Sequence, residues 1–68
     1  MLSLTEILFL TLQERAHYVW NKGMYCYSSW EGNYKITLYW LGNFYAQVWH
    51  EESSNLLLDV TLNETMPQ

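Results

Sequence analysis

The chain has 68 residues, half of them hydrophobic, and a formal net charge of −4 with only Arg15, Lys22 and Lys35 as cations. This length is enough for one domain, residues 1–68, which buries only about 60% of the surface that its unfolded form exposes, so the core needs a supplement. Three scattered cations do not make the basic cluster that phosphate backbones require. We therefore expect no nucleic-acid partner and no attachment to an anionic membrane.

Disulfides, metal ions and oligomerisation are the usual supplements of so small a core. Cys26 is the only cysteine, and His17 and His50 are the only histidines, with no spacing typical of a metal site. We therefore expect no disulfide, no metal and no other cofactor, which leaves oligomerisation. A single free thiol and an N-terminus without the pattern of a signal peptide favour a cytoplasmic location.

The first predicted element is one helix over residues 3–22. Ser3 and Glu6 fit a capping box at its start. Lys22 in the last turn, followed by Gly23, fits a left-handed cap at its end.

The apolar residues of this helix fall in one arc at about 100° per residue, which predicts an amphipathic helix. The arc contains Leu4, Ile7, Leu8, Thr11, Leu12, Ala16 and Val19. Arg15 also falls in the arc, and we interpret it as a snorkelling side chain. Leu10 falls among the polar residues, which indicates an exposed apolar residue or a contact with a partner.

After the helix the hydrophobic period changes to two, which predicts four β-strands. These strands cover residues 24–30, 34–41, 44–51 and 55–62, and residues 63–68 form a tail. The order of elements predicts an α+β fold, with one N-terminal amphipathic helix packed on a four-stranded antiparallel β-meander.

The even-numbered strand positions make a nearly continuous apolar face. Opposed residues of antiparallel strands point to the same face, so even positions oppose each other only across loops of odd length. Three-residue loops at 31–33 and 41–43 and a five-residue loop at 51–55 satisfy this condition. The resulting register pairs Cys26 with Leu38, Leu38 with Ala46, Ala46 with Val60, and Val48 with Leu58.

The string Trp-x-Gly-Asn-aromatic occurs twice, at residues 30–34 and 40–44. We interpret it as a chain-reversal signal whose aromatic residues are core and turn clamps. Asn33 and Asn43 stand last in their loops, where a three-residue hairpin loop needs a left-handed residue. Because glycine precedes each asparagine, a two-residue Gly-Asn turn with an adjacent bulge is the alternative.

The odd-numbered face is the candidate functional surface, because one helix can cover only one face and the even face is the more apolar. The predicted interaction surface consists of Tyr25, Tyr27, Tyr39, Tyr45, Trp49 and Leu57. A contiguous patch of this kind is unusual on a monomer. Tyrosine and tryptophan with few charges are typical of interfaces.

A catalytic site has little support in the sequence. His50 stands beside Glu51 and Glu52, but at a strand end and without the second histidine of a zinc-protease helix. Cys26 is expected in the core, with no base nearby, and His17 on the polar face of the helix. We therefore predict no catalytic and no metal-binding residue.

The sequence favours a small, acidic, non-enzymatic protein-interaction module that forms a homodimer or binds an unidentified protein. The alternative is a binding protein for a planar or sugar-like small ligand, with an aromatic-lined site that dimerisation closes, because an open sheet is a poor cavity. A single-stranded nucleic-acid platform would use the same aromatic residues but lacks an electrostatic groove. An enzyme ranks last.

Dimerisation through the sheet has two expected routes. The strand at 55–62 is a long apolar edge that only Asp59 guards, and such an edge invites pairing with a second chain. Alternatively, the aromatic faces of two chains stack. In that case Asp59→Lys changes little, whereas Trp49→Ala and Tyr39→Ala release monomers.

Overall fold

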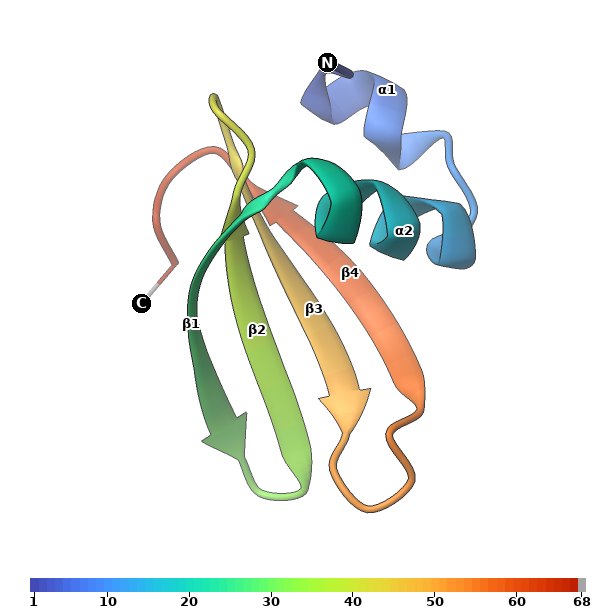
Figure 1. The fold of residues 1–68 in the computed structure, drawn as a ribbon, viewed down its shortest axis with the longest axis vertical. Helices are drawn as coiled ribbons and strands as arrows, with labels where there is room; N and C mark the ends of the chain where they lie inside the picture. The colour runs from blue at the N-terminus through green and yellow to red at the C-terminus, as the bar shows by residue number, and fades with distance from the viewer. Residues whose placement is uncertain (68) are drawn as a thin grey trace.

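The computed structural model describes residues 1–67 and has the predicted α+β arrangement (Figure 1). Its elements are α1 (Leu4–Leu8), α2 (Leu12–Lys22), β1 (Met24–Glu31), β2 (Tyr34–Trp40), β3 (Tyr45–Glu51) and β4 (Leu57–Asn63). The strands form one antiparallel sheet in the order β1-β2-β3-β4, which confirms the predicted meander. Gln68, at the end of the predicted tail, lies outside the described residues.

The predicted single helix over residues 3–22 is two helices in the structure. Ser3 and Glu6 form the expected capping box at the start of α1. A second capping box starts α2: the Glu14 amide donates to the Thr11 hydroxyl, and the Thr11 amide donates to the Glu14 carboxylate. The predicted helix is interrupted here because Thr11 takes the extended conformation of an N-cap.

Gly23 does not form the predicted left-handed cap. Its φ of −81° and ψ of 152° are extended. A Cβ atom at Gly23 would lie 2.6 Å from the carbonyl oxygen of Val19 and 3.0 Å from the Cβ of Tyr39. Glycine is therefore required where α2 passes into β1, chiefly by the close approach of the Val19 carbonyl oxygen and also by that of Tyr39.

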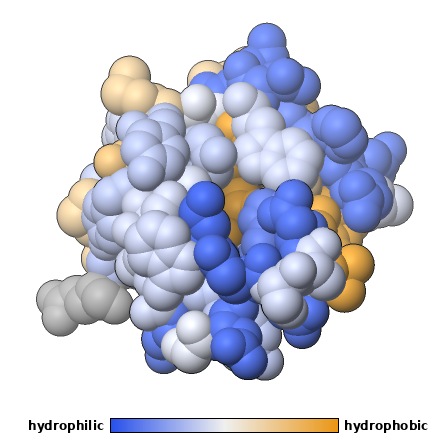
Figure 2. Space-filling model, turned by 60° about the horizontal axis from the view of Figure 1, so that its bottom comes forward, coloured by the Kyte–Doolittle hydropathy of each residue, from blue (hydrophilic) through white to orange (hydrophobic). Residues whose placement is uncertain are grey.

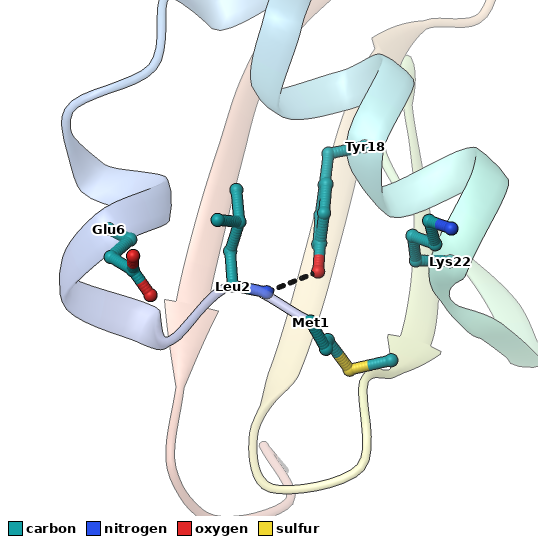
Figure 3. A pocket seen from close by; sticks show the side chains of 5 residues that line it. All are labelled: Met1, Leu2, Glu6, Tyr18 and Lys22. Carbon is teal, nitrogen blue, oxygen red and sulfur yellow. Dashed lines mark hydrogen bonds between the residues drawn. The ribbon is translucent and has the colours of Figure 1, made fainter.

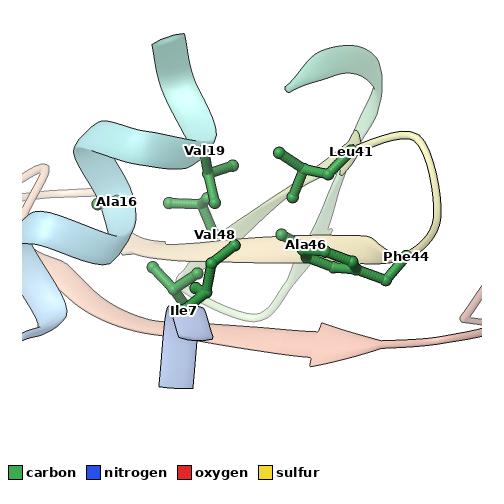
Figure 4. Packing of buried hydrophobic residues seen from close by; sticks show 8 residues of the cluster. Ile7, Ala16, Val19, Leu41, Phe44, Ala46 and Val48 are labelled. Atoms are coloured by element: carbon green, nitrogen blue, oxygen red, sulfur yellow. The ribbon is translucent and has the colours of Figure 1, made fainter. Parts of the chain in front are cut away.

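The main hydrophobic core lies between the helices and one side of the sheet (Figure 4). It consists of Ile7, Ala16, Val19, Leu41, Phe44, Ala46, Val48 and Val60. Backbone contact between helices and strands is sparse and is strongest between α2 and β4. Leu10 is half-buried against this core, so the prediction that it is an exposed apolar residue is wrong.

The β1–β2 and β2–β3 hairpins each turn on a two-residue Gly-Asn pair, the alternative that the sequence left open. Glu31 and Tyr34 pair directly across the first turn, and the Leu41 amide donates to the Phe44 carbonyl oxygen at 2.9 Å across the second. The glycines have φ values of 59° and 94° at the first turn position, as type II′ hairpin turns require. The predicted three-residue loops are therefore wrong.

The even-length turns reverse the parity of the pairing at the first two hairpins. Between β3 and β4 even residues oppose even residues as predicted, but Val48 pairs with Val60 instead of Leu58, so none of the predicted residue pairs forms. The observed pairs are Tyr27–Leu38, Leu38–Gln47, Ala46–Leu62 and Val48–Val60. Two bulges adjust the register further. One lies at Cys26, between Tyr25 and Tyr27, and the other lies at Leu58, where His50 pairs with Leu57.

The register defines two sides of the sheet. The side that faces the helices, the helix side, carries Tyr25, Ser28, Trp30, Lys35, Thr37, Tyr39, Ala46, Val48, His50, Leu57, Val60 and Leu62. The opposite side, the open side, carries Met24, Tyr27, Ser29, Glu31, Tyr34, Ile36, Leu38, Trp40, Tyr45, Gln47, Trp49, Glu51, Asp59 and Thr61. Three successive residues of β2, Ile36, Thr37 and Leu38, are buried, so this central strand is covered on both sides.

Candidate interaction surface

The predicted interaction surface is divided between the two sides of the sheet. Its members on the open side are Tyr27, Tyr45 and Trp49, and its members on the helix side are Tyr25, Tyr39 and Leu57. The prediction that they share one face is wrong for two reasons. The two-residue turn between β2 and β3 puts Tyr39 on the other side from Tyr45 and Trp49, and the bulges at Cys26 and Leu58 change the sides of Tyr27 and Leu57.

Tyr39 is a structural residue. It packs against the main core, and its ring meets the ring of Tyr25 edge-on with the centroids 6.1 Å apart. Burial raises the pKa of the Tyr39 hydroxyl, and Tyr25 adds to this rise. Tyr39→Ala should therefore weaken the fold instead of separating two stacked faces.

The open side has a buried centre of its own. Ile36 and Leu38 are 6% and 1% exposed, although neither belongs to the main core. Two aromatic pairs flank them on the same side: Tyr34 with Trp49, and Trp40 with Tyr45. The ring centroids are 6.5 Å apart in the first pair and 4.6 Å apart in the second. The aromatic residues of this side thus cover a second, thinner layer of core.

Trp49 is held firmly in this layer. It lies opposite Ile36, and its indole Nε1 donates to the hydroxyl of Thr61 at 3.3 Å. The Thr61 hydroxyl in turn donates to the side-chain oxygen of Gln47 at 3.2 Å. This chain of hydrogen bonds makes Trp49 a support of the sheet and a poor candidate for a free contact residue.

β1 carries the most exposed large side chains of the sheet. Met24, Tyr25, Tyr27 and Trp30 are 67%, 59%, 44% and 57% exposed. Figure 2 shows the hairpin end of the molecule as hydrophilic and pale residues with small hydrophobic patches. Such a mixture of aromatic and polar groups resembles an interface more than a purely apolar core.

Trp30 is held in place at the outer end of β1. Its indole Nε1 donates to the carboxylate of Glu52 at 3.0 Å, and the ammonium of Lys35 lies 5.8 Å from its ring centroid. The ring is therefore oriented before any partner arrives, which lowers the entropic cost of a contact.

The backbone of β1 has unpaired groups along its outer edge. Residues 27–31 pair with β2 without interruption, and Glu31 and Tyr34 form the hydrogen-bonded pair next to the turn. Because hydrogen-bonded and non-hydrogen-bonded pairs alternate, Ser28 and Trp30 direct their N–H and C=O groups away from β2. Within residues 1–67 no side chain or loop amide bonds these four groups.

The other edge, β4, is capped at its centre. The N–H of Val60 donates to the carboxylate of Asp59 at 2.8 Å, and the C=O of Val60 accepts from Nη1 of Arg15 at 3.1 Å. Arg15 also donates to the carbonyl oxygens of Leu8 and Leu10, at 3.5 and 3.4 Å. The snorkelling interpretation of Arg15 is therefore wrong, and β4 is guarded by two side chains and not by Asp59 alone.

A pocket of about 490 Å³ lies beside the N-terminal residues (Figure 3). Its lining residues are Met1, Leu2, Glu6, Tyr18 and Lys22. The Leu2 amide donates to the Tyr18 hydroxyl at 2.7 Å. No member of the predicted interaction surface lines this pocket.

The histidines pack against one tryptophan. His50 stacks on Trp20 with the ring centroids 6.0 Å apart, and His17, which is exposed, meets the same ring edge-on at 5.6 Å. Cys26 lies half-exposed at the β1 bulge and not in the core as predicted. Within residues 1–67 no three His, Cys, Asp or Glu side chains gather as metal ligands would.

No protein-family model, curated protein or solved structure matches this chain. Among residues 1–67 there is no helix with the length and apolar character needed to cross a membrane. The functional proposal therefore rests on the geometry of the sheet and its two edges.

Proposed function

We propose that this chain is a small, non-enzymatic protein-interaction module that associates with a second copy of itself through the β1 edge. The difference between the two edges carries the proposal: β4 is capped at Val60, whereas Ser28 and Trp30 of β1 leave their outward backbone groups unpaired. An uncapped edge flanked by aromatic side chains is the feature that strand pairing between chains uses.

The size and charge of the chain support the proposal. A domain of 68 residues has a small core, and association adds burial without a disulfide or a metal. We place the protein in the cytoplasm because its single cysteine is a free thiol. The net charge of −4 argues against nucleic acid or an anionic membrane as the partner.

The ligand-binding alternative has less support. It requires Tyr25, Tyr39, Tyr45 and Trp49 to line one site, but the first two lie on the helix side and the last two on the open side. These four residues therefore cannot form one wall of a pocket that dimerisation closes.

Sedimentation velocity over a wide range of concentrations tests the proposed self-association. We expect the sedimenting mass to rise from the 8.2 kDa monomer toward twice that value. Trp30→Ser should shift this transition to higher concentration. A single 8.2 kDa species at every concentration would contradict the proposal.

Phe9→Ser is the matched control for this experiment. Phe9 is 86% exposed, in the connection between the helices and away from β1 (Figure 1). We expect the Phe9 variant to associate like the wild type. Equal losses in the two variants would attribute association to general apolar exposure and not to the β1 edge.

A further inference from the structure

The β1 edge also defines how two copies would pair, an inference that rests on the proposed self-association. We infer that β1 pairs antiparallel with β1 of a second copy, about a two-fold axis that passes beside Ser29. This pairing would join the two four-stranded sheets into one continuous sheet.

The position of the axis follows from the part of β1 that is regular. The bulge at Cys26 interrupts the strand at one end and the turn ends it at the other, so residues 27–31 are available and Ser29 is their centre. An axis at Ser29 places Ser28 of each copy opposite Trp30 of the other, and all the outward N–H and C=O groups find partners. An axis at Ser28 would instead place Trp30 opposite the bulge.

Charge favours a second copy in this arrangement. Residues 24–40 contain one acidic residue, Glu31, and one basic residue, Lys35, and the Glu52 carboxylate lies beside Trp30, so this margin carries only a small part of the net charge of −4. Antiparallel pairing places the two Glu31 side chains at opposite ends of the contact, each beside a Tyr27. Parallel pairing in register would place them side by side, where like charges repel.

The side chains near the axis leave room for the second copy. Ser29 is small and exposed on the open side, and it would meet its symmetry mate in a non-hydrogen-bonded pair, with Cα atoms about 4.5 Å apart. On the helix side each large Trp30 would meet a small Ser28. The helices lie over the other end of the sheet, where α2 contacts β4 most, and they do not obstruct this half of β1 (Figure 1).

A cysteine at the axis tests the register directly. In a Cys26→Ser background, Ser29→Cys should form a disulfide-linked dimer under mild oxidation, because non-hydrogen-bonded pairs bring Cβ atoms within bridging range. The control is Ser53→Cys in the same background, at an exposed position in the β3–β4 loop. Cross-linking of both variants at the same rate would overturn the inferred register.

Opposite charges at the axis give a second test. Ser29→Lys and Ser29→Glu should each sediment as a monomer, because like charges meet at the axis, and an equimolar mixture should recover the dimer. Circular dichroism checks that both variants keep the fold. If the wild type associates and neither charge changes its affinity, the inferred pairing is wrong while the proposed function stands through another surface. A wild type that stays monomeric overturns both.

Discussion

The two edges of the sheet differ in how their outward backbone groups are satisfied. At β4, Arg15 and Asp59 bond both polar groups of Val60, whereas at β1 the corresponding groups of Ser28 and Trp30 have no partner within residues 1–67. The cap at β4 reduces the free energy of folding that it contributes, because the Nε of Arg15 is buried without a hydrogen-bond partner. The protein thus blocks one edge with a partly buried charge and leaves the other edge available.

This difference shows why exposure alone is a weak guide to a contact surface. Leu58 on β4 and Tyr27 on β1 are both exposed apolar residues. On β4 the outward groups of Val60, at the centre of the edge, are already bonded, whereas on β1 the outward groups of Ser28 and Trp30 are both unpaired. Strand pairing needs a continuous row of such groups as well as exposed side chains.

Leu38→Ala should have the largest effect on stability. Leu38 is 1% exposed, lies opposite Tyr27 of β1, and its truncation should cost about 2–5 kcal/mol in a urea titration. Leu58→Ala, at the β4 bulge, is the matched control and should cost less because that side chain is 38% exposed. Equal costs would show that the open side of β2 has no buried layer.

Arg15→Ala should uncap the β4 edge. It leaves the carbonyl of Val60 without its partner, for which we expect a loss of about 1–3 kcal/mol in the free energy of unfolding. We also expect new concentration-dependent association through β4, measured by sedimentation in the Ser29→Lys background. Arg15→Lys, which keeps the charge, should have a free energy of unfolding between those of the wild type and of Arg15→Ala. An unchanged Arg15→Ala variant would refute the capping role.

Thr11→Ala should loosen the start of α2, the helix that carries Arg15. Loss of the N-cap bond from the Glu14 amide should cost about 1 kcal/mol in thermal or urea unfolding. Gln13→Ala is the control, an exposed position in the same turn. If both variants lose the same stability, the second capping box does not determine where α2 begins.

The smallest expected effect is a pH dependence of the two capping boxes. Hydrogen bonds from Ser3 and Thr11 lower the pKa of Glu6 and of Glu14 below the ordinary value of 4.5. Because each carboxylate has a lower pKa in the folded state than in the unfolded state, its ionised form stabilises the fold at pH values above the unfolded pKa. This contribution is lost as the pH falls through the folded pKa. Helicity followed by circular dichroism should therefore decrease on acidification below that value, and Glu14→Gln should reduce the decrease.

Much of the fold could be predicted because it depends on local signals. The change of period after Gly23 and the Gly-Asn pairs located the helical part and all four strands. The break at Thr11 was also predictable, because Thr-Leu-Gln-Glu repeats the capping pattern of Ser-Leu-Thr-Glu.

The faces of the sheet could not be predicted with the same success. Whether a Gly-Asn turn contains two or three residues depends on the φ of glycine and asparagine, and a change of one residue moves every side chain of a strand to the other face. Tyr39 consequently lies against the core and Leu38 on the open side, the reverse of the prediction. The bond from Arg15 to Val60 spans 45 residues, and no local pattern signals it.

Amide hydrogen exchange, measured by NMR at several protein concentrations, can show whether the outward N–H groups of β1 bond to a second copy. We expect protection of the Ser28 and Trp30 amides to increase with concentration, because these N–H groups become bonded to a second β1. The outward amide of Leu62 on β4 should exchange at the same rate throughout. Protection that increases at Leu62, or that stays constant at Ser28 and Trp30 while the protein dimerises, would show that β1 is not the edge that pairs.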